Sequence, residues 1–198
     1  MSAVKKVLLE ATMKLRPRSV SARLDVELLL CLVFGCERSW LYANPGVVLS
    51  EEQLADFTLL LERRMSGEPI AYILGEQEFY SLKLKVSPDV LVPRADTESV
   101  VEWVLANFSE EPLNVADLGT GSGAIAIALA KHRPMWSVLA TDVSLSALAL
   151  AKENADAHTV SNIDFVQGHW FSQLGSRMFD LIVSNPPYIS EGDCHLTD

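Results

Sequence analysis

Residues 115–123, Val-Ala-Asp-Leu-Gly-Thr-Gly-Ser-Gly, decide the fold of this chain, together with the alanine-rich stretch 124–130 that follows them. An apolar run, three alternating glycines and an apolar helix-forming stretch predict a β-strand, a glycine loop and an α-helix. Glycine at positions 119, 121 and 123 leaves out the Cβ atoms that would keep a ligand away from the loop backbone, and the helix begins with free N–H groups. The loop therefore predicts a binding site for a polar ligand.

Strands and helices alternate from residue 113 onward. Apolar runs at 113–118, 136–141, 163–167 and 179–184 predict strands, and the stretches 122–131 and 144–156 predict helices. This alternation is typical of an α/β domain with a parallel sheet, whose ligand binds at the carboxyl ends of the strands. The glycine loop, Asp142, Trp170 and Asn185 each follow one of these strands, so we expect them in one crevice.

Two carboxylates help to choose the ligand. Ala124 completes a G-x-G-x-x-A pattern, so the loop alone fits a dinucleotide as well as S-adenosylmethionine. Asp142 is placed to accept hydrogen bonds from two ribose hydroxyls, which both cofactors carry. Asp117, at the end of the first strand, would repel a pyrophosphate but attract the ammonium group of a methionine moiety. The sequence therefore predicts S-adenosylmethionine as the cofactor.

The tetrapeptide Asn185-Pro186-Pro187-Tyr188 follows the fourth strand. A residue before proline favours an extended backbone, and two prolines remove two backbone donors, which leaves a segment rich in acceptors. The side-chain oxygen of Asn185 and the carbonyl oxygen of Pro186 can face a planar NH2 group, and the Tyr188 ring can lie over its flat face. A simple turn after a buried strand is the alternative. Combined with the glycine loop, the tetrapeptide predicts methyl transfer to an amide or amine nitrogen.

Composition limits the function further. The chain has 198 residues, a formal charge of −10 and a pI near 4.8, which suits poorly a protein that follows a nucleic-acid backbone. Cys31, Cys36 and Cys194 are odd in number and lack metal-ligand spacing, which favours a reduced cytoplasmic setting. His195 beside Asp193 is typical of a solvated loop, so we expect no metal. No apolar run is long enough to span a bilayer, and we expect a soluble protein without a membrane partner.

The amino-terminal third predicts a small helical bundle. Val4, Val7, Leu8, Ala11 and Leu15 recur at helical spacing, Gly35 ends a second helix over 21–34, and Ser50 with Gln53 forms a capping box for a third helix that runs to about residue 65.

After Pro69 the pattern changes. Alternation over 79–86 predicts a strand or hairpin arm, and Asp96 or Thr97 is expected to cap the helix that leads into the glycine-loop domain. We therefore expect a helical domain over 1–68, a connecting segment with a β-hairpin over 69–93 and the glycine-loop domain over 94–198.

The chain resembles the HemK-type peptide chain release factor glutamine methyltransferases over nearly all its length. The specific match lies in Gly-Glu-Pro-Ile-Ala-Tyr-Ile-Leu-Gly at 67–75, Glu78-Phe79, and Val-Pro-Arg-Ala-Asp-Thr-Glu at 92–98. The resemblance implies a Rossmann-like methyltransferase domain and a substrate glutamine in the Gly-Gly-Gln loop of a release factor. It implies that the glutamine is held by Asn185, Pro186, Pro187 and Tyr188, with Asn185, Pro186 and Tyr188 as the catalytic group. It implies a cofactor site made of Asp117, Gly119, Thr120, Gly121, Ser122, Gly123, Asp142, Trp170 and Asn185.

Three features depart from the family pattern. Ala95 stands where a proline is usual. His169 stands where an acidic residue is usual before Trp170, so the carboxylate that would accept from the adenine amino group is absent. Family members also continue beyond the equivalent of Asp198, so we expect an incomplete sheet and activity only with the further strands.

Two other functions stay open. One is an adenine N6 methyltransferase acting on nucleic acid, against which stand the charge and the lack of a base-reading motif. The other is an inactive binding domain.

Overall fold

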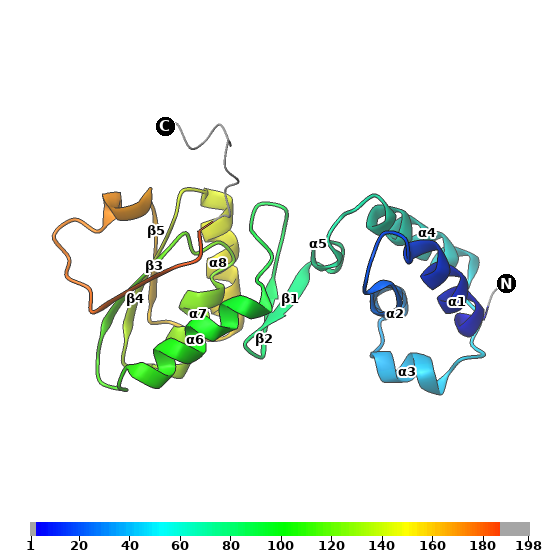
Figure 1. Ribbon diagram of the computed structural model, residues 1–198, viewed down its shortest axis with the longest axis horizontal. Coiled ribbons are helices and arrows are strands. Elements are labelled where there is room, and N and C mark those ends of the chain that lie inside the picture. The colour runs from blue at the N-terminus through cyan, green and yellow to red at the C-terminus, as the bar shows by residue number, and fades with distance from the viewer. Residues whose placement is uncertain (1–2, 187–198) are drawn as a thin grey trace. The chain divides into compact units, whose positions relative to one another are not determined.

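The computed structural model describes residues 3–186, which form two compact units divided between Gly75 and Glu76 (Figure 1). None of the described helices is long and apolar enough to cross a membrane.

The first unit is a helical bundle, as predicted. Its described part contains α1 Val4–Leu15, α2 Ala22–Phe34, α3 Arg38–Ala43, α4 Glu51–Met65 and α5 Ile70–Leu74. The periodic apolar positions of α1 are buried together with Leu29 and Leu30 of α2 and Phe57 of α4. Gly35 ends α2 in the left-handed region at φ 61°, and both hydrogen bonds of the capping box between Ser50 and Gln53 are present. The periodicity did not predict the short helices α3 and α5.

Two buried carboxylates on α2 are paired within this bundle. Asp25 accepts from Arg64 Nε at 2.8 Å and from the Ser19 hydroxyl at 2.7 Å. Glu27 accepts from Arg23 and Arg38, and also from the Tyr42 hydroxyl. Burial acts to raise the pKa of Glu27, but these hydrogen bonds hold it below its usual range. The paired charges thus hold α2 to α3 and α4.

The second unit begins with an antiparallel hairpin, β1 Glu76–Phe79 and β2 Leu82–Lys85. The left-handed backbone of Tyr80 and Ser81 makes the tight connection between its strands. Leu82 and Leu84 are buried while Lys83 and Lys85 are exposed, so the predicted alternation is confirmed.

Asn154 links the hairpin to the glycine loop. This buried residue accepts from Lys85 N at 2.7 Å and donates to Lys85 O at 3.0 Å and to Ser122 O at 2.9 Å. Since buried polar groups are costly to leave unpaired, these contacts fix the loop relative to its support.

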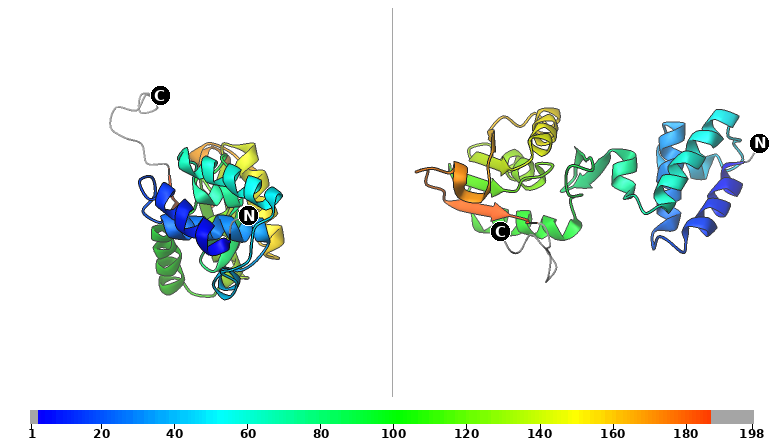
Figure 2. Two further views of the ribbon diagram at one scale, coloured as in Figure 1. Left: turned by 90° about the vertical axis from the view of Figure 1, so that its right-hand side faces the viewer. Right: turned by 90° about the horizontal axis from the view of Figure 1, so that it is seen from above.

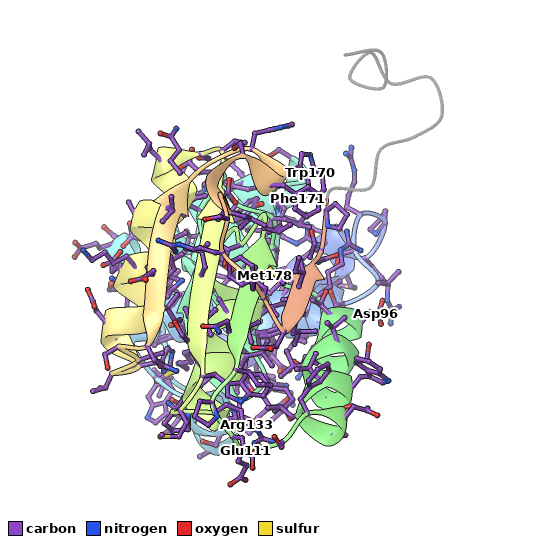
Figure 3. All side chains as sticks on the ribbon, turned by 90° about the vertical axis from the view of Figure 1, so that its left-hand side faces the viewer. Asp96, Glu111, Arg133, Trp170, Phe171 and Met178 are labelled. Atoms are coloured by element: carbon purple, nitrogen blue, oxygen red, sulfur yellow. The ribbon has the colours of Figure 1, made fainter. Side chains whose placement is uncertain are left out.

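The sheet is parallel and has the strand order β5-β4-β3-β6. Its strands are β3 Asn114–Leu118, β4 Ser137–Asp142, β5 Ile163–Gln167 and β6 Leu181–Ser184, and its helices are α6 Ala95–Asn107, α7 Ala124–His132 and α8 Leu145–Ala157. The predicted α/β alternation is confirmed. Helices α6, α7 and α8 share one apolar core with the sheet, and β6 lies beside α6 (Figures 2 and 3).

The opposite face of the sheet carries a smaller apolar layer. Leu174 and Phe179, from the segment between β5 and β6, pack there against Leu118 and Leu139. This segment also contains the one-turn helix η1 Trp170–Gln173 and the exposed Met178 (Figure 3).

The predicted cap of α6 is wrong. The helix begins at Ala95 with extended Arg94 as its N-cap, and no side chain caps it. Because the helix starts before the predicted cap residues, Asp96 and Thr97 lie inside its first turn. Thr97 is buried, and its hydroxyl accepts a hydrogen bond from Asn185, which follows β6.

Candidate cofactor and substrate site

The glycine loop turns at the carboxyl end of β3 and is tied to the next strand. The amides of Gly119 and Thr120 both donate to Thr141 O at 2.9 Å. Gly119 and Gly121 have φ values of 76° and 55°, and a Cβ atom built on either would meet nothing within 4 Å. These two glycines therefore adopt the left-handed backbone that the turn requires, and they leave open space beside the loop for a ligand.

Gly123 has a different role from the other two loop glycines. Its φ is 83°, and a Cβ atom there would lie 2.7 Å from Ile127 Cδ1 and 3.1 Å from Ala151 Cβ. It lines neither of the two cavities beside the loop. The missing side chain at 123 lets α7 start and lets α8 approach, so packing explains this glycine without a ligand.

Asp142 joins the loop to the end of β4. Its Oδ2 accepts from Gly121 N at 2.9 Å and its Oδ1 from Ser144 N at 3.0 Å. Each carboxylate oxygen has a further lone pair, and the residue is partly exposed in the larger cavity. Asp142 can therefore hold the loop and still accept from ligand hydroxyls.

Asp117 is a buried carboxylate beneath the loop. Its Oδ2 accepts from the Thr120 hydroxyl at 2.7 Å, while Oδ1 has no hydrogen-bond partner among the described residues. Burial raises the pKa of Asp117 to about 6, although the Thr120 hydroxyl acts in the opposite direction. The backbone N–H of Ala126 also lowers this pKa. A cationic ligand group would satisfy the free oxygen and favour the ionised form.

Two adjoining cavities lie at this end of the sheet. The larger, about 330 Å³, falls in the size range of small-molecule sites. Asp142, Gly168, His169, Trp170 and Pro186 line it among others. The smaller, about 50 Å³, is lined by Asp117, Thr120, Ser122, Thr97 and Pro93 among others. Both share Leu91, Gly119, Gly121 and Asn185, so the glycine loop and the predicted substrate segment face one space.

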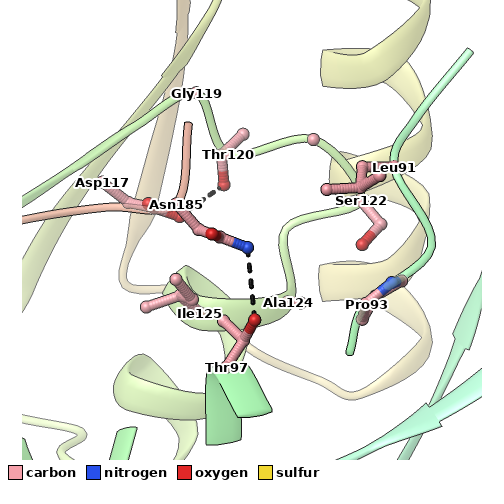
Figure 4. A pocket seen from close by; sticks show the side chains of 11 residues that line it. Leu91, Pro93, Thr97, Asp117, Gly119, Thr120, Ser122, Ala124, Ile125 and Asn185 are labelled. Atoms are coloured by element: carbon pink, nitrogen blue, oxygen red, sulfur yellow. Dashed lines mark hydrogen bonds between the residues drawn. The ribbon is translucent and has the colours of Figure 1, made fainter. Parts of the chain in front are cut away.

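Asn185 follows β6 and lines the smaller cavity together with Asp117 and Thr120. Its Nδ2 donates to Thr97 Oγ1 at 3.2 Å (Figure 4). The neighbouring Ser184 hydroxyl donates to Leu118 O at 2.7 Å and ties the end of β6 to β3. Pro187 and Tyr188 lie outside the described residues.

Trp170 lines the larger cavity, is exposed and has a left-handed φ of 46°. The backbone N–H of His169 donates to the Ser172 hydroxyl at 3.0 Å, and Gly168 N donates to Asp142 O at 2.9 Å. Residues held in strained backbone regions cluster at functional sites. His169 also lines the cavity, at the position where the family pattern has an acidic residue.

Sequence reasoning missed several lining residues. Asp89, Val90 and Leu91, from the loop before α6, line the larger cavity, and Thr97 lines the smaller one. The short apolar run before Pro93 gave no functional signal, because its approach to the glycine loop depends on how the domain packs. No group of three or more His, Cys, Asp or Glu side chains suited to a metal occurs in 3–186.

Fold and site together define an α/β methyltransferase. Residues 95–197 match the family model described as the methyltransferase small domain, and residues 6–75 match the PrmC N-terminal domain. The chain belongs to the release factor glutamine methyltransferase family. It is 47% identical over 197 residues to the protein of that name from Coxiella burnetii, 48% over 181 residues to the one from Aliivibrio fischeri, and 50% over 180 residues to the one from Vibrio cholerae.

The alignments cover nearly the whole chain but only part of the relatives. They include 99%, 91% and 90% of this chain, against 71%, 64% and 63% of the three relatives. The chain thus spans about two thirds of the length of the curated relatives that it matches.

Proposed function

We propose that this chain binds S-adenosylmethionine and transfers its methyl group to the side-chain amide nitrogen of the glutamine in the Gly-Gly-Gln motif of peptide chain release factors. The observation that carries the proposal is that Asn185 and the glycine loop line the same two adjoining cavities. The names of the relatives support the choice of substrate.

The residues present fit this cofactor. The free Oδ1 of Asp117 suits the ammonium group of the methionine moiety, and Asp142 suits the ribose hydroxyls. The open space at Gly119 and Gly121 admits the cofactor backbone. Trp170 lines the larger cavity, where its ring would contact the adenine. Bound there, the cofactor supplies an activated methyl group on a sulfonium ion.

The protein's own task is to orient the accepting nitrogen. An amide nitrogen is a weak nucleophile because its lone pair is delocalised. The Asn185 side-chain oxygen and the Pro186 carbonyl oxygen would accept from its two hydrogens and hold the lone pair toward the methyl group. Such alignment is worth about 7–11 kcal/mol, against about 1.5–3 kcal/mol for one charge-assisted hydrogen bond. Transfer of the methyl group from sulfur to nitrogen would make one nitrogen proton acidic, and that proton would leave to water, so the chain would need no dedicated base.

The flat contact from Tyr188 and the role of Pro187 remain part of the proposal. They rest on the sequence motif and on the family.

The charge distribution favours a protein substrate over a nucleic acid. Residues 1–75 contain nine basic and nine acidic residues, whereas residues 76–198 contain seven basic and seventeen acidic ones. The unit that carries the site therefore holds the whole net charge of −10, which would repel a phosphate backbone. Because translation takes place in the cytoplasm, a release-factor substrate also implies that location.

The experiment separates the proposed function from its alternatives. The chain, and an extended chain that adds the remaining carboxyl-terminal residues of one of these relatives, are each incubated with radiolabelled S-adenosylmethionine and either a bacterial release factor or DNA. We expect the extended chain to label the release factor. Label in DNA with an unlabelled release factor would support the adenine methyltransferase instead. The inactive binding domain is tested by calorimetric titration, in which it gives no saturable heat with the cofactor.

A further inference from the structure

The buried hydroxyl of Thr97 meets the amide group of Asn185 from a different element of the fold. Thr97 lies in the first turn of α6 and Asn185 follows β6, 88 positions later in the chain. The Nδ2-to-Oγ1 distance is 3.2 Å, and both residues line the smaller cavity (Figure 4).

The contact matters because an asparagine amide has two different edges. Its oxygen accepts and its NH2 group donates, and the two can exchange places by a rotation of the amide. In the proposed reaction the oxygen must face the substrate NH2 group. The Asn185 NH2 group then points the other way and needs an acceptor in a partly buried place, which Thr97 Oγ1 supplies.

We infer that Thr97 is a positioning residue for methyl transfer, which holds the Asn185 amide in the orientation that presents its oxygen to the substrate. This inference rests on the proposed function. Thr97 touches neither reacting atom in this role and acts through Asn185.

Both partners are held on rigid elements. The Thr97 amide donates to Arg94 O at 3.0 Å, and Val101 and Val104 of the same helix are fully buried in the core. A β-branched side chain also has few rotamers in a helix. Asn185 follows a strand end that the Ser184 hydroxyl fixes to Leu118. The hydroxyl and the amide are therefore preorganised, as a positioning role requires.

The alternative is that Thr97 only fills space under α6. Thr97→Val keeps the shape and removes the hydroxyl, whereas Thr97→Ser keeps the hydroxyl and removes a methyl group. A space-filling role predicts a larger loss for serine, and a positioning role predicts a larger loss for valine. Ser99→Ala is the matched control, because that hydroxyl lies in the same stretch of helix, is exposed and bonds to Asp96 O.

The test measures kcat for the extended chain at saturating cofactor and release factor, so that weaker binding does not enter. We expect Thr97→Val to lower kcat roughly tenfold, as for one lost hydrogen bond to an amide that must stay oriented, and Thr97→Ser to stay within about twofold of wild type. In the Asn185→Ala background, Thr97→Val should add little.

Failure of the inference is distinct from failure of the proposed function. If the wild-type extended chain methylates no release factor, the proposed function is wrong. If it methylates release factor and Thr97→Val is as fast, or Thr97→Ser is the slower variant, the inference is overturned. Thr97→Ala replaces Thr97→Val in the same comparison if the valine variant does not fold.

Discussion

The carboxylate of Asp142 accepts a hydrogen bond from the backbone N–H of Gly121 at 2.9 Å, so the end of β4 holds the glycine loop that follows β3. The same carboxylate faces the larger cavity. Loop geometry and ligand recognition thus depend on one side chain.

Replacing Asp142 with alanine should weaken S-adenosylmethionine binding by about 1–3 kcal/mol, because the ribose hydroxyls lose their charged acceptor. The measurement is calorimetric titration. Asp164→Ala is the control, since this carboxylate lies on the adjacent strand β5 and lines neither cavity of the site. Equal affinities for wild type and folded Asp142→Ala would remove Asp142 from the site.

Cofactor affinity should fall as the pH is lowered through about 6, the raised pKa of Asp117. Below that value the carboxyl group is protonated and no longer attracts the ammonium group of the ligand. Titrations between pH 5 and 8 would show the dependence. Asp117→Asn should bind weakly and lose this dependence, and an unchanged profile in the variant would assign the effect to another group.

The same residue should reduce the stability of the cofactor-free protein at neutral pH. The pKa of Asp117 in the folded protein lies above the ordinary value of 3.8. The protonated carboxyl group therefore contributes its full stabilisation below pH 3.8, and this stabilisation is lost as the pH rises through about 6. Asp117→Asn should therefore raise the free energy of unfolding at pH 7.5 by up to about 3 kcal/mol.

Denaturant unfolding at several pH values checks this stability prediction. The advantage of the variant should shrink toward pH 4. A variant that is less stable than wild type at pH 7.5 would show that burial of the charge is not costly here.

Gly121 and Gly123 should respond differently to the same substitution. Gly123→Ala should destabilise the fold by about 1–3 kcal/mol, because a left-handed φ combines with a Cβ atom 2.7 Å from Ile127. Gly121→Ala meets no protein atom, so beyond the cost of its φ it should mainly weaken cofactor binding. Gly121→Val should weaken it further. Thermal unfolding and calorimetry on these variants separate the two effects, and a larger binding loss for Gly123→Ala would reverse our assignment.

Local pattern predicted most of the fold, and contacts between distant residues explain what it missed. Strand and helix alternation, the stop at Gly35 and the capping box at Ser50 are encoded within a few residues of one another. The hydrogen bond between Thr97 and Asn185 joins segments 88 positions apart, so no local sequence pattern predicts it. The packing role of Gly123 likewise depends on Ile127 and Ala151, which the loop motif does not specify.

The positions of candidate site residues that follow strands could be predicted from the sequence. Properties that depend on burial in the packed domain could not. Asp117, Asp142 and Asn185 each follow or end a strand, so the parallel sheet places them together. The raised pKa of Asp117 comes from complete burial, which appears only once the domain is packed.

The central claim is that Asn185 orients a glutamine amide for methylation, and mass spectrometry of the release factor tests it most directly. The release factor is incubated with S-adenosylmethionine and either the wild-type extended chain or its Asn185→Ala variant, and the peptide that contains Gly-Gly-Gln is sequenced. We predict one methyl group on the glutamine side chain with wild type and little or none with the variant, although the variant still binds the cofactor. A methyl group on another residue, or equal methylation by wild type and variant, would contradict the claim.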